Sequence, residues 1–167
     1  MTIDVQIRPE VPGDESTIHD VTERAFAGRS YSSGTEQDIV DALRVQHALA
    51  ISLVAECDDR IVGHVAFSPA SPEDGTPGWY TLGPVSVDPE IQRRGIGRAL
   101  VSAGIAQLRE SGASGCIVVG DSGYYSRFGF VKAPEHAPID ELKEHFMILS
   151  FTAHVPSGVI NWHPAFQ

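Results

Sequence analysis

The segment Gln92–Ala99 constrains the fold of this chain more than any other part of the sequence. It reads Gln-Arg-Arg-Gly-Ile-Gly-Arg-Ala, and it follows an apolar run that ends at Val87. Apolar residues then recur at helical spacing, at Ile96, Leu100, Ala103 and Leu108. This order predicts a strand, a short connection and a helix whose first turn holds two glycines. Free N–H groups and the dipole at such a helix start favour a bound pyrophosphate, and glycines allow it to approach the backbone.

Two other glycine-rich phosphate loops do not fit this segment. A dinucleotide-binding fingerprint needs a third glycine where this chain has Leu100, and a Walker A loop needs a Gly-Lys-Ser/Thr sequence that is absent. Arg93, Arg94 and Arg98 add positive charge that suits a phosphate-rich ligand. Taken alone, the segment fits a solvated basic helix start as well as it fits an anion-binding site.

The composition limits the remaining possibilities. A length of 167 residues predicts one domain, and a net charge of −10 argues against a nucleic-acid partner, which requires a basic face. An acidic surface favours cationic substrates such as amines, although solubility explains it equally well. No apolar window is long enough to span a membrane, and residues 1–12, which hold charges and lack a continuous apolar stretch, are not expected to form a signal peptide. Two distant cysteines, Cys57 and Cys116, indicate buried reduced thiols and no metal pattern, so we expect a cytoplasmic protein.

Periodicity and turn residues give an outline of the elements. Strands are expected at 4–8, 51–57, 61–68, 79–87, 115–119, 130–131 and 146–155, and a helix is expected to run from Ile96 to about Gly112. Two earlier helices begin at the expected N-caps Asp14 and Thr35, and the second has Ile39, Val40, Leu43 and Val45 as its expected buried stripe. A brief helix is expected around 124–127, an irregular stretch at 134–145 and a tail at 156–167. Strands and helices mix without strict alternation, so the predicted class is α/β or α+β with a mixed sheet.

A second motif lies about thirty residues after the first. Gln92–Gly97 resembles the Q/R-x-x-G-x-G/A signature of the GNAT superfamily of N-acetyltransferases, and it follows a strand ending Val-Ser-Val-Asp-Pro as in that family. Tyr124–Phe130 resembles the C-terminal aromatic-Tyr-x-x-x-Gly-Phe motif of the same family. Weaker likenesses at Ile7-Arg8-Pro9, Ile61–His64 and Leu82-Gly83-Pro84 extend the resemblance to the YhbS-like group of bacterial acetyltransferases. It covers roughly residues 5–155.

The resemblance implies a single acetyltransferase domain over residues 1–167, with a core at 5–155, that takes acetyl-CoA as cosubstrate. Its twisted mixed sheet would have splayed central strands with the cofactor between them, and a bulge near Gly83-Pro84. The pantetheine arm would pair with the strand at 85–87, and the pyrophosphate would meet the amides of 93–99. The residues implied in cofactor binding are Val85, Ser86, Val87, Gln92, Arg93, Arg94, Gly95, Ile96, Gly97, Arg98, Ala99 and Ser122. Ser122 is equally suited to capping a short helix.

The implied reaction is direct attack of an amine on the thioester. Tyr125 aligns with the family's general acid, which suits a phenol whose usual pKa is near 10, and the N–H of Val87 would meet the oxyanion. Glu36 and His64 are candidate general bases, but Glu36 also fits a helix-start carboxylate and His64 a hydrogen-bonded strand histidine. A water chain or an already neutral amine would need no base residue.

Three functional hypotheses follow from the resemblance and the residues. The first is an amine acetyltransferase, the second is a catalytically silent acyl-CoA-binding regulatory module, and the third is a nucleotide-binding protein that uses the same helix start. The loops at 28–34 and 69–78 and the tail are expected to shape the acceptor pocket, whose ligand the sequence leaves unnamed. Dimerisation is common in the family, so a homodimer is a further expectation.

Overall fold

A computed structural model describes residues 4–166, which form two compact units. Within the described range, unit 1 comprises residues 4–67 and 83–105, and unit 2 comprises residues 68–82 and 106–166. The single domain expected over residues 1–167 stays a prediction. None of the described helices is long and apolar enough to cross a membrane.

Unit 1 is built on an antiparallel three-stranded arrangement. β1 (Gln6–Pro9) pairs with β2 (Ile51–Cys57), and β2 pairs with β3 (Arg60–Pro69), most of which lies in this unit. The turn between β2 and β3 has positive φ at both central residues, Asp58 and Asp59, as a two-residue type I′ hairpin requires. The strands expected at 51–57 and 61–68 are therefore confirmed, and they form a hairpin.

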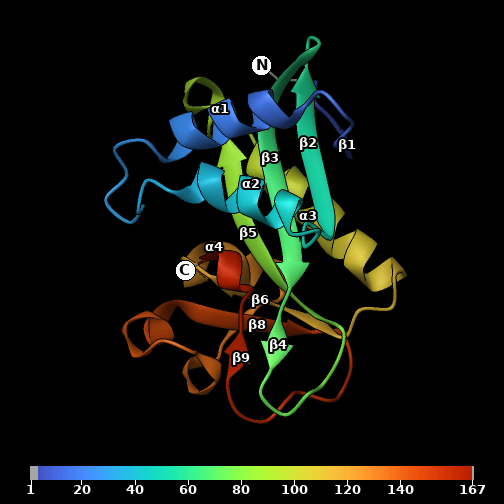
Figure 1. Ribbon diagram of the computed structural model, residues 1–167, viewed down its shortest axis with the longest axis vertical. Coiled ribbons are helices and arrows are strands. Elements are labelled where there is room, and N and C mark those ends of the chain that lie inside the picture. Colours follow the sequence, from blue (N-terminus) through green and yellow to red (C-terminus); the bar gives the residue numbers. More distant parts are fainter. Residues whose placement is uncertain (1–3, 167) are drawn as a thin grey trace. The chain divides into compact units, whose positions relative to one another are not determined.

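Helices cover both faces of these strands. α1 (Glu15–Phe26) and α2 (Glu36–Val45) lie on the near side of β2 and β3 in Figure 1. Ile18, Val40 and Val54, all fully buried, join the two helices to β2. The opposite face of β3 receives the start of α3 (Ile96–Glu110).

Gly63 of β3 permits this close approach of α3. A Cβ atom at this position would lie 3.0 Å from Leu100 Cδ1, 3.0 Å from the Ser86 carbonyl oxygen and 3.2 Å from Ile96 Cγ2. These contacts are tighter than ordinary van der Waals packing, and one of them is to rigid backbone. The missing side chain therefore lets the first turns of α3 pack directly on the strand.

Unit 2 combines parallel and antiparallel pairing. The first part of β5 (Trp79–Val87) pairs parallel with β6 (Gly115–Val119), which pairs antiparallel with β8 (Phe146–Ser150). β8 also pairs with β7 (Val131–Lys132). β4 (Ser71–Pro72) and β9 (Ile160–Asn161) form a separate antiparallel pair. In Figure 1, β4 is green and β9 is red. The core of this unit is Trp79, Ile117, Ala133, Phe146, Ile148 and Ile160.

The complete strand order is β1-β2-β3-β5-β6-β8-β7, with β4-β9 as a second sheet. β5 supplies residues 79–82 to unit 2 and residues 83–87 to unit 1. The mixed sheet flanked by helices confirms the predicted fold class.

Several local expectations are wrong. The predicted final strand 146–155 ends at Ser150, because the Ser150 hydroxyl turns the chain by donating to the Thr152 carbonyl at 2.8 Å. Val45 is 77% exposed, since it lies two residues after the buried Leu43 and so faces away from it on the helix. β9 is an addition, because the sequence analysis places no strand after Val155.

Asp14 and Thr35 precede their helices as expected, but neither side chain caps its helix. Asp14 Oδ2 instead accepts from Arg8 Nη1 and from the Val11 N–H, both at 2.9 Å. The Thr35 hydroxyl is bonded to the Ser33 hydroxyl at 2.6 Å. The helix positions were predictable from the residue types, whereas the partners of the polar side chains were not.

Candidate active site

The start of α3 has the geometry of an anion-binding site. After β5 the chain makes one turn of 3-10 helix, Pro89–Ile91, and then takes positive φ at Arg93 and at Gly95 before α3 begins at Ile96. The first helical hydrogen bond runs from the Ala99 N–H to the Gly95 carbonyl at 3.0 Å. The preceding N–H groups have no acceptor within the helix, so they and the positive end of the helix dipole are available to an anion.

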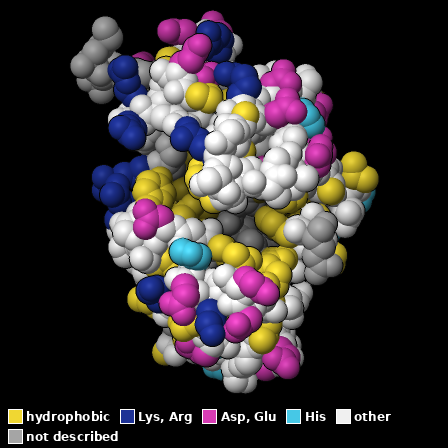
Figure 2. Space-filling model, turned by 90° about the vertical axis from the view of Figure 1, so that its left-hand side faces the viewer, with side chains coloured by type: hydrophobic (Ala, Val, Ile, Leu, Met, Phe, Trp, Pro, Cys, Tyr) yellow, Lys and Arg dark blue, Asp and Glu magenta, His cyan; other side chains and the backbone are white. Residues whose placement is uncertain are grey.

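Three arginines surround this helix start. Arg93, Arg94 and Arg98 are exposed, and none of them forms an ion pair with any described acidic residue. By contrast, Arg8, Arg24 and Arg44 each pair with at least one carboxylate. Several Lys and Arg side chains lie near one another in the upper left of Figure 2, whereas acidic side chains are spread over the face that it draws. Since acids outnumber bases by 22 to 12, three unpaired arginines at one helix start favour a polyanionic ligand.

The Gln92 side chain braces the connection between β5 and α3. Its Oε1 accepts a hydrogen bond from Arg29 Nη2 at 2.9 Å, and its Nε2 donates to the Val87 carbonyl at 3.2 Å. Both ends of the amide are therefore engaged within unit 1. A direct contact between Gln92 and a cofactor stays a prediction.

The predicted pantetheine strand, residues 85–87, lies in the part of β5 that belongs to unit 1. Val85 and Val87 are half-buried, whereas Ser86 is buried and donates its hydroxyl proton to Thr22 Oγ1 of α1 at 3.2 Å. Only the backbone of Ser86 is thus left for a ligand. Gly83 has a φ of 128° and is followed by a cis bond to Pro84, and the bulge expected near these residues stays a prediction.

Tyr125 ends a short helix in unit 2, α4 (Ser122–Tyr125). Asp121 caps this helix by accepting from the Gly123 N–H at 2.9 Å, and Ser122 is its first residue. The Tyr125 ring packs edge-on against Tyr124 and Phe130, with centroid distances of 5.0 and 5.9 Å. A Cβ atom at residue 120 would collide with this ring, so a glycine there makes room for it. The phenol is thus held by aromatic packing on several sides.

Residues next to Tyr125 fit the second sequence motif. A 3-10 turn over Ser126–Phe128 ends at Gly129, whose φ of 102° is the left-handed conformation that glycine adopts without strain. The Arg127 guanidinium lies over the Tyr124 ring at 5.1 Å, which is a cation–π contact. The glycine that the motif requires is therefore explained by backbone geometry.

The two candidate bases lie on different elements of unit 1. Glu36 is the first residue of α2, is half-buried, and accepts from the Ser32 hydroxyl at 2.6 Å. His64 is fully buried in β3, and burial lowers its pKa to about 4. Its Nε2 lies 2.8 Å from Ser52 Oγ. No hydrogen bond among the described residues joins Glu36 to His64, so they are separate candidates.

Glu10, Arg44 and Ser52, which the sequence analysis did not single out, connect to His64. Ser52 donates to Glu10 Oε1 at 2.6 Å, and Arg44 donates to both oxygens of Glu10 at 2.8 and 3.0 Å. A signal was present in the sequence, since Ser52 and His64 are polar residues inside apolar strand runs. Their diagonal pairing across β2 and β3 depends on the register between the strands.

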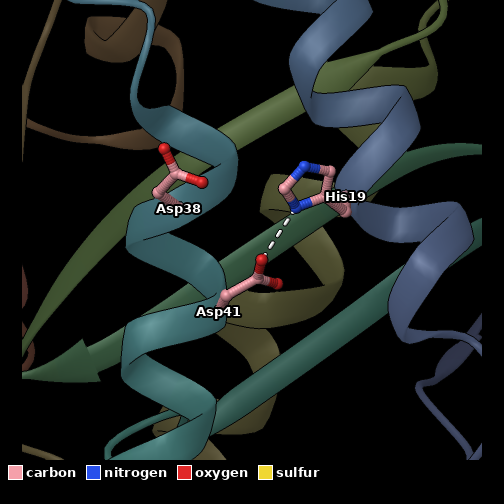
Figure 3. A group of neighbouring side chains, drawn as sticks. All are labelled: His19, Asp38 and Asp41. Carbon is pink, nitrogen blue, oxygen red and sulfur yellow. Dashed lines mark hydrogen bonds and ion pairs between the residues drawn. The ribbon is translucent and has the colours of Figure 1, made fainter.

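His19 of α1 lies close to Asp38 and Asp41 of α2, and Figure 3 shows its interaction with Asp41. His19 Nδ1 lies 2.7 Å from Asp41 Oδ2, and a ligand atom from each of His19, Asp38 and Asp41 falls within 4.8 Å of the others. The bond to Asp41 raises the pKa of His19. The ion pair between His19 and Asp41 accounts for this geometry, so these three residues give no evidence for a metal site.

Comparisons with known proteins agree with these features. The profile of the acetyltransferase (GNAT) family matches residues 17–130. The uncharacterised N-acetyltransferase YhbS of Escherichia coli K12 is 36% identical over 131 residues, which cover 78% of this chain and 75% of that protein.

Solved structures show the same fold. A GNAT acetyltransferase from Brucella melitensis, in complex with acetyl-CoA, is 47% identical with a TM-score of 0.88, over 98% of this chain and 99% of that one. YhbS from Escherichia coli, in complex with CoA, is 29% identical with a TM-score of 0.89, over 99% of this chain and 93% of that one. With its signature at the start of α3 and its aromatic motif at α4, this chain belongs to the GNAT family of acetyltransferases.

Proposed function

We propose that the protein transfers the acetyl group of acetyl-CoA to a primary amine. The observation that carries the proposal is the start of α3, where free helix N–H groups lie beside three exposed arginines that form no ion pair with a described acidic residue. Pyrophosphate is the part of acetyl-CoA that this arrangement recognises. Two similar proteins, from Brucella melitensis and Escherichia coli, hold acetyl-CoA and CoA in their structures, which supports this choice of ligand.

The chemistry proceeds by direct attack. The amine nitrogen bonds to the thioester carbonyl carbon, the C–S bond breaks, and the sulfur of CoA leaves as a thiol after it takes a proton from the Tyr125 hydroxyl. A base removes the proton that the amine loses, and Tyr125 regains its proton from water. His64 and Glu36 remain the candidate bases, and the Val87 N–H is the candidate oxyanion donor.

Replacing Tyr125 with Phe tests the general acid. The substitution removes one hydroxyl and keeps the ring that packs on Tyr124 and Phe130. We expect turnover to fall about 100-fold, the usual contribution of a positioned acid, while the affinity for acetyl-CoA by calorimetry stays unchanged. Tyr124→Phe is the matched control, because it makes the same chemical change at the adjacent ring.

The assay is release of free CoA thiol with a panel of amines. Cys57 is a half-exposed free thiol and Cys116 is buried, so Cys57→Ser is the background for a thiol reagent. If the wild type binds acetyl-CoA but releases no thiol with any amine, the protein is a silent acyl-CoA-binding module. Displacement of CoA by ATP or NAD at similar concentrations would instead identify a nucleotide-binding protein.

A cytoplasmic location and a homodimer belong to the same proposal. Free cysteines, one of them half-exposed, fit a reducing compartment. Cell fractionation tests the location, and sedimentation of the purified protein tests the dimer.

A further inference from the structure

A polar chain runs from a buried histidine to the surface of unit 1. His64 on β3 is fully buried, Ser52 on β2 and Glu10 just after β1 follow it, and Arg44 on α2 holds Glu10. The register explains the alignment. His64 lies opposite Val54 and Ser52 opposite Ala66, which places Ser52 diagonal to His64 on one face. The Glu10 N–H bonds to the Ser52 carbonyl, which sets their side chains next to each other.

The proton positions in this chain follow from its chemistry. Glu10 is held by the Arg44 guanidinium through both oxygens, so it is ionised and can only accept hydrogen bonds. Ser52 has one hydroxyl proton, which it donates to Glu10 at 2.6 Å. The bond of 2.8 Å between Ser52 and His64 Nε2 must then be donated by the histidine. A neutral His64 thus carries its proton on Nε2, and Nδ1 is an unprotonated nitrogen.

Nδ1 of His64 is buried and has no hydrogen-bond partner in the described structure. A buried ring nitrogen without a partner costs stability, so its retention calls for a role. The other end of this hydrogen-bonded series, at Glu10, is open to water. Glu10, Arg44 and Ser52 line a surface pocket of about 440 Å³ together with His47 and Leu49, and the Glu10 side chain is 15% exposed.

We propose that His64 accepts the proton of the attacking amine at Nδ1, and that Ser52 and Glu10 pass a proton on to water in this pocket. The proposal rests on the proposed acetyl transfer. Nδ1 gains a proton, Nε2 releases its own to Ser52 Oγ, and the Ser52 hydroxyl proton moves to the Glu10 carboxylate. Glu10 then releases it to water, and the return of the Ser52 and His64 protons to their starting atoms resets the chain. His64 is the base, Ser52 and Glu10 relay the proton, and Arg44 is a positioning residue that holds Glu10.

The charges around the chain prevent it from storing the proton. The charged groups facing His64 are Glu10 and Arg44, and burial outweighs the favourable carboxylate in lowering the pKa of His64 to about 4. Burial raises the pKa of Glu10, but the hydrogen bonds from Arg44 and Ser52 outweigh it and the net shift is downward. Both groups are therefore unprotonated at neutral pH and ready for the next turnover.

Two substitutions separate the parts of the relay. Ser52→Ala breaks the chain, so we expect His64 to lose its fixed Nε2–H form and kcat to fall about tenfold or more, with the KM for acetyl-CoA unchanged. Ser52→Thr keeps a hydroxyl, so it should restore both the Nε2–H form of His64 and the wild-type kcat. Glu10→Gln can still accept from Ser52 but cannot take up a proton in the same way, so it should lower kcat while His64 keeps its proton on Nε2. Glu56→Gln is the control, because the Glu56 carboxylate is bonded to Arg8 and takes no part in the proposed relay.

The protonated ring nitrogen is read by ¹⁵N NMR of the seven histidines, with the His64 signals assigned by their loss in His64→Gln. A proton on Nδ1 in the wild type overturns the relay, whatever the activity. Unchanged kcat in both Ser52→Ala and Glu10→Gln, in a wild type that transfers acetyl groups, overturns it as well and leaves the proposed function intact. If the wild type transfers no acetyl group to any amine, the proposed function and the relay fall together.

Discussion

At the scale of single residues, the burial of His64 couples the stability of unit 1 to pH. Its pKa is about 4 in the folded chain and 6.5 when exposed, so the unfolded state binds the proton more readily. The stability gained by keeping His64 neutral is present above pH 6.5 and is lost as the pH falls towards 4. A difference of this size corresponds to about 3 kcal/mol.

We therefore expect His64→Gln to remove about 3 kcal/mol of the decrease in unfolding free energy that the wild type shows between pH 6.5 and pH 4. Urea denaturation at several pH values measures the free energy of unfolding of each protein. Taking the difference between the two proteins cancels the contribution of carboxylates that titrate in the same pH range. His145→Gln is the control, because His145 is exposed. Parallel curves for His64→Gln and the wild type would show that His64 is not the acid-sensitive group.

Single residues also show how far sequence reasoning reaches. The role of Gly129 was predictable, because the end of a helix often takes the left-handed backbone that glycine adopts without strain. The chain through Glu10, Ser52 and His64 was not, because its members are 42 and 12 residues apart and meet only through strand register. A local pattern identifies a polar residue in a strand but not its partner.

At the scale of elements, the residues leading into α3 and its first turn concentrate positive charge in Arg93, Arg94 and Arg98. We expect Arg93→Gln, Arg94→Gln and Arg98→Gln each to weaken acetyl-CoA binding about five- to tenfold, because each removes a charge that the proposed binding mode places beside a phosphate. Their combination should also reduce the salt dependence of the dissociation constant. Calorimetry at several salt concentrations measures both effects.

Arg60→Gln serves as the matched control, since Arg60 is exposed, lies in the same unit and forms no ion pair with a described residue. An equal loss of affinity in this variant would indicate a general effect of net charge. In that case α3 would have no special role in binding.

Elements with a strong local period were predictable, and elements that depend on distant contacts were not. β5 and β6 have the predicted bounds, because apolar residues between turn signals mark them. β9 has only two residues and exists because it pairs with β4, almost ninety residues earlier. The hydrogen bonds of Ser150 ended β8 early in the same way, through side-chain partners that periodicity does not reveal.

At the scale of the whole molecule, both tryptophans, Trp79 and Trp162, belong to unit 2. Trp79 shares a core with Ile160, which is fully buried, so fluorescence reports on the packing of that unit. Ile160→Ala should lower the free energy of unfolding by about 2–5 kcal/mol through loss of buried surface and the cavity left behind. The fluorescence midpoint in urea should fall accordingly.

Val131→Ala in β7 provides the comparison, because Val131 is 60% exposed in the same unit. It should change the midpoint little. A small effect of Ile160→Ala would instead mean that the segment after Val155 contributes little to the core of unit 2.

The helix start at α3 has a kinetic consequence for the proposed reaction. Pyrophosphate is the same in acetyl-CoA and in the CoA that remains after transfer, so in the proposed binding mode Arg93, Arg94 and Arg98 hold substrate and product alike. Binding of this kind lowers the concentration of substrate needed but does not drive the chemical step. The product CoA should thus compete with acetyl-CoA for the same binding site. The rate at which CoA dissociates then sets an upper limit on turnover.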